Sequence, residues 1–293
     1  MIEKESLDAV AVIGLPQIRY WMMLLAHKFP NPQLNLTLEL FLRIIKGFFR
    51  EQLVSVVLYG SITFDDLAPG YGDLDFLVVV DDNLSDEICR QLVELRKPLR
   101  SGDYGILSKM LEGAFLPRRM LNPANTGKAF WWGTSGEKPW ESNQLGWFVL
   151  HVIRERGIVI WGEDIRHEIP LASHEDLIKE VWMVCKSIKQ HARGGRLHSV
   201  DWLLTASRLL LWLKEGRLSS KSEAADWGFT HTNGAWRELL PQARQIRLNP
   251  SVVDSAEMKR WLDALTGSIR EASEEVEREL AEQGLRQSVT EKL

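Results

Sequence analysis

Two stretches, Leu58-Tyr-Gly-Ser61 and Tyr71-Gly-Asp73-Leu-Asp75-Phe-Leu-Val-Val-Val80, decide the fold predicted for this chain of 293 residues. Each adjoins an apolar run rich in β-branched residues, which is typical of a buried strand. Asp73 and Asp75 fall where the second strand begins, and side chains two residues apart on a strand point to the same face. The sequence therefore predicts two carboxylates side by side at the mouth of a sheet.

A pair of carboxylates in this position suits a divalent cation. Mg²⁺ prefers oxygen ligands, and it binds proteins through one or two carboxylates while the phosphates of a substrate complete its shell. Gly60 lets the backbone approach a ligand closely, and Ser61 offers a hydroxyl and an N–H to a phosphate. An isolated Asp-x-Asp is usually solvated, whereas Gly-Ser ending one strand with Gly-Asp-Leu-Asp opening the next is much more specific.

A third carboxylate, Glu112, lies in a short strand predicted at residues 109–117, where Leu111 and Gly113 point to the opposite face. A carboxylate in an apolar strand is costly unless it meets a cation or a partner. If this strand lies beside the one that holds Asp75, Glu112 completes the acidic cluster and can take the proton of an acceptor hydroxyl as general base. The alternative is an edge-strand glutamate that faces solvent.

Composition excludes few classes. The chain has 36 basic and 40 acidic residues and a net charge of −4, without the basic excess of a dedicated nucleic-acid binder. No apolar run reaches the ~20 residues needed to cross a bilayer. Cys89 and Cys185 lack the spacing of a metal site or disulfide and indicate packed thiols of a reducing compartment. We expect a cytoplasmic protein, monomeric, without nucleic-acid or membrane partners.

Tryptophan is concentrated at residues 118–148, a Gly-rich segment that predicts either a functional loop or a pair of short strands. Indoles can stack on a nucleobase, a flat ligand or a sugar. Trp131 and Trp132 are the candidates for contact with substrate, because glycines flank them. The alternative is that these indoles pack the sheet against the rest of the protein.

Composition changes near residues 164–170, so we predict a sheet domain over 1–165 and a helical domain over 166–293. The first domain would begin with helices, one of them at 18–27. In the second domain, Arg208 lies off the apolar stripe of an amphipathic helix, and Lys221 lies near the start of the next helix. Both could face a triphosphate across a cleft, and solvent-exposed charge is the alternative for each.

Two further segments, Leu204-Thr-Ala-Ser-Arg208 and Gly216-Arg-Leu-Ser-Ser-Lys221-Ser-Glu-Ala-Ala-Asp226-Trp227, complete a resemblance. The strand motifs resemble those of the nucleotidyltransferase superfamily whose core is that of DNA polymerase β. With the helical segments, the chain is most similar to the aminoglycoside (3″)(9) adenylyltransferases, which confer streptomycin and spectinomycin resistance, over most of residues 54–250. The resemblance implies an α+β fold, with a mixed β-sheet domain followed by an all-α helical bundle.

The resemblance also implies a reaction, the transfer of AMP from ATP to a hydroxyl with release of pyrophosphate and the help of two Mg²⁺ ions. The residues it assigns are the metal ligands Asp73, Asp75 and Glu112, with Glu112 also the catalytic base; the nucleotide contacts Gly60 and Ser61; and the phosphate-binding cations Arg208 and Lys221.

The segment expected to bind the acceptor departs from the family pattern. Where the family has acidic and tryptophan drug contacts, residues 189–198 are basic, and such a run would repel a cationic streptomycin. Asp201 could replace one lost carboxylate, and spectinomycin is the expected acceptor. The alternatives are a different acceptor (another antibiotic, a metabolite or a protein side chain) and a non-catalytic nucleotide-binding or antitoxin-like module. Arg193-x4-His198 matches a helical ribonuclease motif only loosely.

Overall fold

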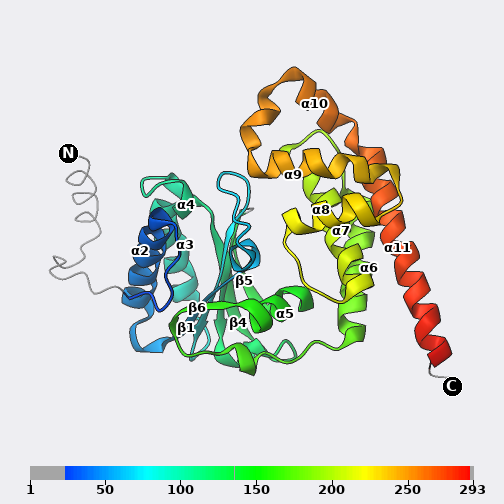
Figure 1. Cartoon of the computed structure of the whole chain (residues 1–293). Coiled ribbons are helices and arrows are strands. Elements are labelled where there is room, and N and C mark those ends of the chain that lie inside the picture. The colour runs from blue at the N-terminus through cyan, green and yellow to red at the C-terminus, as the bar shows by residue number, and fades with distance from the viewer. Residues whose placement is uncertain (1–23, 135, 291–293) are drawn as a thin grey trace.

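The computed structural model describes residues 24–134 and 136–290, with side chains as far as residue 284. A half built on a β-sheet lies beside a half built of helices, with α11 (Leu265–Thr290) along the outer edge of the helical half (Figure 1). Most of the helix predicted at 18–27 lies outside the described residues. The predicted α+β class is confirmed, since a mixed sheet is followed by helices alone.

The sheet has six strands in the order β5-β4-β3-β2-β1-β6. In chain order these are β1 (Leu53–Tyr59), β2 (Leu74–Val80), β3 (Leu111–Pro117), β4 (Thr126–Gly133), β5 (Gly136–Ser142) and β6 (Ile158–Gly162). Neighbouring strands are antiparallel except β2 and β3, which are parallel. The tryptophan-rich segment thus forms a pair of short strands, one of the two predicted outcomes.

The two motif strands, β1 and β2, lie together near the middle of the sheet. All seven residues of β1 are buried, as are all residues of β2 except Asp75, which is typical of strands covered on both faces. A parallel neighbour requires a crossover connection. Helices α3 (Asp86–Ser101) and α4 (Ile106–Lys109) supply it between β2 and β3, so both strands begin at the same edge of the sheet.

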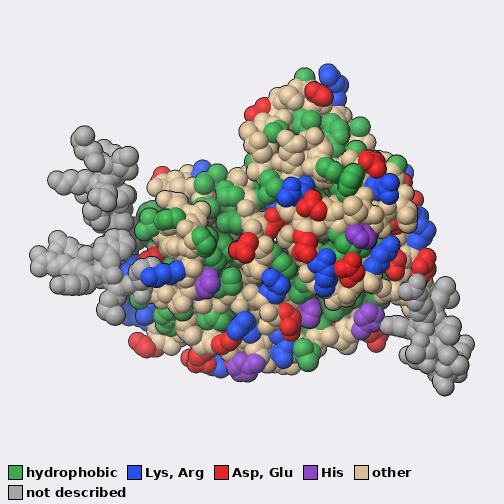
Figure 2. Space-filling model, in the orientation of Figure 1, with side chains coloured by type: hydrophobic (Ala, Val, Ile, Leu, Met, Phe, Trp, Pro, Cys, Tyr) green, Lys and Arg blue, Asp and Glu red, His purple; other side chains and the backbone are tan. Residues whose placement is uncertain are grey.

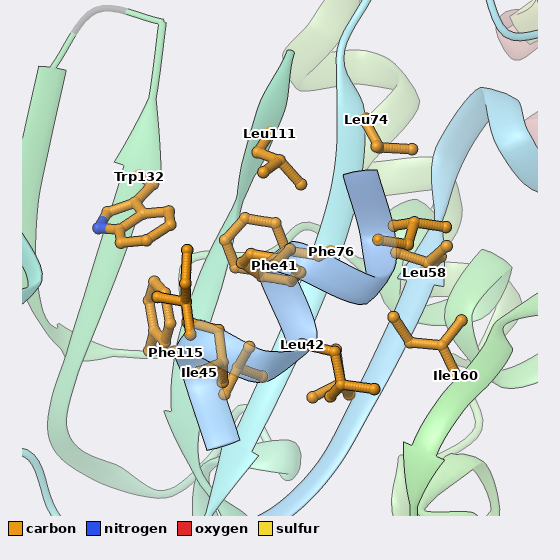
Figure 3. Close-up of a cluster of buried hydrophobic side chains, with 14 of the residues drawn as sticks. Phe41, Leu42, Ile45, Leu58, Leu74, Phe76, Leu111, Phe115, Trp132 and Ile160 are labelled. Atoms are coloured by element: carbon orange, nitrogen blue, oxygen red, sulfur yellow. The ribbon is translucent and has the colours of Figure 1, made fainter. Parts of the chain in front are cut away.

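One face of the sheet is covered by α2 (Pro32–Phe49), whose first turn is capped by the side chain of Asn31. Figure 3 shows Phe41 of this helix lying over Phe76 of the sheet, and Phe115 belongs to the same buried cluster. The rings of Phe41 and Phe76 are 4.7 Å apart. Trp132 belongs to the same buried cluster, so the core of this half lies between α2 and the sheet.

The opposite face of the sheet is covered by α5 (Trp147–Arg156). Leu150 and Ile153 of α5 pack against Tyr59 and Leu77 in a second apolar cluster. Because side chains alternate along a strand, Asp75 shares this face with Leu77. The acidic residues therefore open toward α5 and not toward the main core under α2.

The helical half contains, in chain order, α6 (His174–His191), α7 (Val200–Glu215), α8 (Lys221–His231), α9 (Leu240–Leu248), α10 (Ala256–Asp263) and α11. Ser173 forms a capping box with Asp176 at the start of α6. Most residues of α7 are buried, and apolar side chains of its neighbours surround it. α7 is thus the central helix of this half, and Gly216, in a left-handed conformation with φ 69°, ends it.

The connection between β1 and β2 reaches from the sheet half into the helical half. Ala68 and Tyr71 of this connection belong to the same apolar cluster as the core residues of α7. The predicted boundary at residues 165 and 166 falls between β6 and α6, and it stays a prediction. Through this connection, the two halves also contact each other far from that boundary in the sequence.

Basic and acidic side chains are interspersed on the face that Figure 2 shows. Cys89 and Cys185 are both buried as free thiols. In the described part of the chain, no helix combines the length and the apolar character needed to cross a bilayer.

Candidate active site

A cavity of about 340 Å³ lies between the two halves. Its lining from the sheet half includes Tyr59, Gly60, Ser61, Tyr71, Asp73, Asp75 and Phe148, and its lining from the helical half includes His198, Asp201, Arg208, Ser219, Lys221 and Arg247. A more open hollow of about 540 Å³ beside β6 includes none of the residues of the sequence motifs. We therefore take the cavity between the halves as the candidate site, because its lining contains residues of the sequence motifs.

The three predicted carboxylates meet at the edge of the sheet where β2 and β3 begin. Asp75 on β2 lies directly opposite Tyr59 of β1 on one side and Glu112 of β3 on the other. Neighbouring strands are about 4.8 Å apart, and paired residues project from the same face. Asp73 precedes β2 by one residue, so it lies on the cavity side of this acidic cluster.

The electrostatics of the acidic cluster favour a cation. Burial, followed by the charges of Asp73 and Glu112, raises the pKa of Asp75 to about 8. Burial, followed by the charge of Glu112, raises the pKa of Asp73 to about 6. Partly buried carboxylates that repel one another are stabilised by a cation between them, so this cluster could hold a metal ion.

The loop after β1 is shaped around Asp75. Gly60 has a left-handed φ of 70°, and a Cβ atom at this position would lie 2.0 Å from Oδ2 of Asp75. Any other residue would push the carboxylate away, so the predicted role of Gly60 in close approach is explained by Asp75. The adjacent Ser61 Oγ is buried, and within the described chain it has no hydrogen-bond partner. Ser219 Oγ, across the cavity, is in the same state.

These residues fit Mg²⁺ as an ion shared between protein and nucleotide. Within the described ranges, no group of three or more His, Cys, Asp or Glu side chains is placed to hold a metal ion by itself. Mg²⁺ commonly uses one or two carboxylates with water and substrate phosphates, and Asp73 and Asp75 supply two. Glu112 is already engaged, because its Oε2 accepts the N–H of Thr134 at 2.5 Å; its predicted part as a ligand stays a prediction.

The predicted cations of the helical half line the same cavity. Burial, followed by the charge of Arg247, lowers the pKa of Arg208, and the nearby carboxylates of Asp66 and Asp75 act in the opposite direction. Lys221 Nζ donates a hydrogen bond to Asp201. Both residues therefore face the acidic cluster from across the cavity, and neither is the solvent-exposed charge of the alternative interpretation.

Asp201 was predicted as a substrate contact, and it lies in the cavity with partners of its own. Its Oδ2 is 3.2 Å from Nδ1 of His198, and its Oδ1 accepts from Lys221. Burial alone would raise the pKa of Asp201, but the hydrogen bond with His198 and the charge of Lys221 outweigh it and lower the pKa to about 2. The ring of Tyr71 packs 4.6 Å from that of His198. Sequence reasoning did not select Tyr71 or His198.

Side chains alternate between the two faces of the sheet along β4, so the two tryptophan candidates lie on opposite faces. Trp132 is fully buried, with its ring 4.8 Å from that of Phe115 in the core under α2, so its predicted contact with substrate is wrong. Trp131 lies on the opposite face, opposite Ala114, and stacks on Trp140 at 5.0 Å. It shares the face of Glu112, and neither Trp131 nor Glu112 lines the cavity; the roles of both stay predictions.

Sequence reasoning also missed a buried ion pair between the halves. Nη1 of Arg247 in α9 donates to Oδ1 of Asp66 at 2.9 Å. Ser222 at the start of α8 donates to the same carboxylate through Oγ, at 2.6 Å, and through its N–H, at 3.2 Å. Asp66 lies in the connection between Ser61 and Asp73. This bridge fixes the motif loop against the helical half.

Residues 169–279 match a family model described as "Aminoglycoside adenylyltransferase, C-terminal domain". This part of the helical half is therefore similar to the C-terminal domain of aminoglycoside adenylyltransferases, in line with the resemblance seen in the sequence. A search of curated proteins found no match.

Among solved structures, the fold is similar to one described as "Crystal structure of spectinomycin adenyltransferase AAD(9) from Enterococcus faecialis with ATP and spectinomycin". The match has a TM-score of 0.64 and 16% sequence identity, and it covers 82% of this chain and 98% of that chain. At this identity the likeness concerns the fold, and it extends over both halves of the protein.

Proposed function

We propose that this protein transfers AMP from ATP to a hydroxyl of an aminoglycoside or aminocyclitol antibiotic and releases pyrophosphate. The observation that supports this most is the composition of one cavity, which is lined by Asp73 and Asp75 from the sheet half and by Arg208 and Lys221 from the helical half. A magnesium triphosphate needs both kinds of group, because carboxylates hold its metal and basic side chains balance its remaining charge.

Each residue has a defined task in the proposed reaction. Asp73 and Asp75 would hold two Mg²⁺ ions, which supply charge neutralisation at the phosphates. Glu112 takes the proton of the acceptor hydroxyl, whose oxygen bonds to the α-phosphorus as the bond to pyrophosphate breaks. Ser61 donates its unpaired hydroxyl to a phosphate oxygen, and Arg208 and Lys221 stabilise the leaving pyrophosphate.

Spectinomycin is the proposed acceptor in preference to streptomycin. Within the described residues of the basic run 189–198, His198 is the one that lines the cavity. Lys189 instead pairs with Glu277 on α11. The basic run therefore reaches the cavity through His198 and not as a whole. Asp201 already pairs with Lys221, so it offers a strongly cationic drug less attraction than an unpaired carboxylate would. The similar solved protein was crystallised with ATP and spectinomycin.

A transfer assay tests this proposal directly. Purified protein is incubated with ATP labelled at the α-phosphate, MgCl₂ and one acceptor at a time, and labelled product and pyrophosphate are measured together. We expect labelled spectinomycin, one pyrophosphate per product, and no labelled streptomycin. Label on a different antibiotic, a metabolite or a protein would keep the chemistry and change the acceptor. Binding of ATP without transfer to any acceptor would favour the non-catalytic module.

The raised pKa values of the acidic cluster predict a stability profile for the metal-free protein. The pKa of Asp75 is about 8 in the folded state and has an ordinary value of 3.8. Between these values the folded state binds more protons than the unfolded state, so folding becomes less favourable as pH rises. We expect Asp75→Asn to melt at a higher temperature than the wild type at pH 8, in EDTA, and the difference to shrink toward pH 5.

Added MgCl₂ provides the matching measurement. Since metal binding requires ionised carboxylates and stabilises the state that binds it, Mg²⁺ should raise the melting temperature of the wild type at pH 8 more than at pH 5. It should have less effect on Asp75→Asn. Parallel melting profiles for the two proteins, with and without Mg²⁺, would contradict a metal role for Asp75.

A further inference from the structure

The buried guanidinium of Arg96 lies beside the acidic edge of the sheet. Arg96 belongs to α3, and 2% of its surface is exposed. A buried charge is costly unless hydrogen bonds satisfy it. Its ion pair is with Glu137 of β5, at 3.0 Å between Nη1 and Oε1, and its guanidinium carbon lies 5.7 Å from the centre of the Trp132 ring. The ion pair alone does not account for this position, because the guanidinium also binds the backbone of two strands.

Arg96 occupies the point at which β3 and β4 stop pairing. The ladder between these strands ends with Gly113 opposite Trp132. Beyond this pair, Nη2 of Arg96 donates to the carbonyl of Leu111 at 3.2 Å, and Nη1 donates to the carbonyl of Gly133 at 2.9 Å. The carbonyl of Leu111, which could extend the ladder, and the carbonyl of Gly133 thus bind one guanidinium. Arg96 ends the ladder at the level of Glu112.

The opened ladder determines the surroundings of Glu112. Leu111 and Gly133, whose carbonyls bind Arg96, immediately precede Glu112 and Thr134 in the chain. The N–H of Thr134 donates to Oε2 of the Glu112 side chain at 2.5 Å. One oxygen of the Glu112 carboxylate is therefore held by the strand that Arg96 fixes. The hydrogen bond leaves Oε1 of this carboxylate to accept a proton.

We propose that Arg96 is a positioning residue for Glu112: by ending the ladder between β3 and β4, it directs the Thr134 N–H at the Glu112 carboxylate and orients it for proton transfer. This inference rests on the proposed role of Glu112 as general base. Arg96 itself does not line the cavity. It acts on Glu112 through the backbone of the two strands, beside the attraction between its charge and that carboxylate.

The neighbouring Arg100 offers a matched control. It lies one turn further along α3 and pairs with the same Glu137, at 3.1 Å, but its side chain is 43% exposed. Its other hydrogen bond, at 3.5 Å, goes to the carbonyl of Thr134, and it binds neither of the two carbonyls that Arg96 holds. A general effect of losing positive charge beside β5 would appear in Arg100→Met as well as in Arg96→Met.

We expect Arg96→Met to lower kcat about tenfold to a hundredfold, because a catalytic group displaced by about 1 Å loses activity on this scale. The KM for ATP should change less than about twofold, since the ATP contacts are elsewhere, and Arg96→Lys should recover part of the loss by donating to one carbonyl. Arg100→Met should keep the kcat of the wild type. Equal losses in both variants would overturn the proposal.

A double-mutant cycle separates positioning from a structural role. In a Glu112→Gln background, Arg96→Met should cost less than about twofold in residual kcat, because the group that it orients no longer takes a proton. An undiminished loss in this background would show that Arg96 acts on something other than Glu112. If Glu112→Gln by itself leaves kcat unchanged, the base assignment fails, and this outcome is distinguishable from a failure of Arg96 alone.

Thr134→Pro covers the case in which Arg96→Met does not fold. It removes the N–H donor while Arg96 stays in place, and Thr134→Ala, which keeps the N–H, is the reference. We expect kcat of Thr134→Pro to fall at least about tenfold below that of Thr134→Ala, with ATP affinity retained. Equal kcat in the two variants would overturn the proposal.

Discussion

Glu112→Gln is expected to lower kcat for adenylyl transfer by about 10²- to 10⁴-fold, the range that general bases contribute. The amide oxygen can still accept the N–H of Thr134, which bonds to Oε2 in the wild type at 2.5 Å, so the local structure should persist. The variant loses only the ability to take a proton. ATP affinity, measured by isothermal titration calorimetry with MgCl₂ present, should stay within about twofold of the wild type, because the phosphate contacts are unaltered.

Glu141→Gln is the control for this substitution, since Glu141 lies exposed on β5 and does not line the cavity. Its kcat should equal that of the wild type. Undiminished turnover in Glu112→Gln would remove Glu112 from the mechanism. Loss of ATP binding together with turnover would instead assign Glu112 to the metal site, as one of the predictions from the sequence has it.

Arg247→Met is expected to lower the free energy of unfolding by about 3–5 kcal/mol, because removing one partner leaves the other as an uncompensated buried charge. The side chains of Arg247 and Asp66 are 3% and 8% exposed, and their atoms are 2.9 Å apart. Ser222 would remain as the partner of Asp66 but brings no positive charge. Urea unfolding followed by far-UV circular dichroism measures the change.

Arg244→Met is the matched control on the same helix. Arg244 is 40% exposed and lies 3.6 Å from Asp226, an ion pair that should contribute about 1 kcal/mol or less. The double variant Asp66→Asn, Arg247→Met should lose less stability than the two single variants summed, because the groups are coupled. Equal losses in Arg247→Met and Arg244→Met would show that the bridge does not stabilise the folded state.

The sequence predicted the parts of the fold that depend on local pattern. Continuous apolar runs predict β1 and β2, and the alternation around Glu112 places its side chain opposite in direction to Leu111 and Gly113. Ser85 and Ser173 predict the starts of α3 and α6 by their capping preference, and both side chains accept the expected backbone N–H.

The rest of the site depends on contacts between residues that are far apart in sequence. Asp66 and Arg247 are 181 residues apart, and neither stands in a motif, so no local pattern connects them. The choice between Trp131 and Trp132 required the register of β4, because a shift of one residue exchanges the two faces of a strand. Flanking glycines alone could not decide between them.

The insertion of the β1–β2 connection into the helical half limits how this protein can be recombined with proteins of similar fold. Asp66, Ala68 and Tyr71 contact the helical half, although they precede it by about a hundred residues in the chain. A chimera joined at residue 165 would pair the connection of one parent with the helices of another. An exchange of acceptor preference should therefore transfer residues 65–72 together with the C-terminal half, so that inherited contacts stay matched.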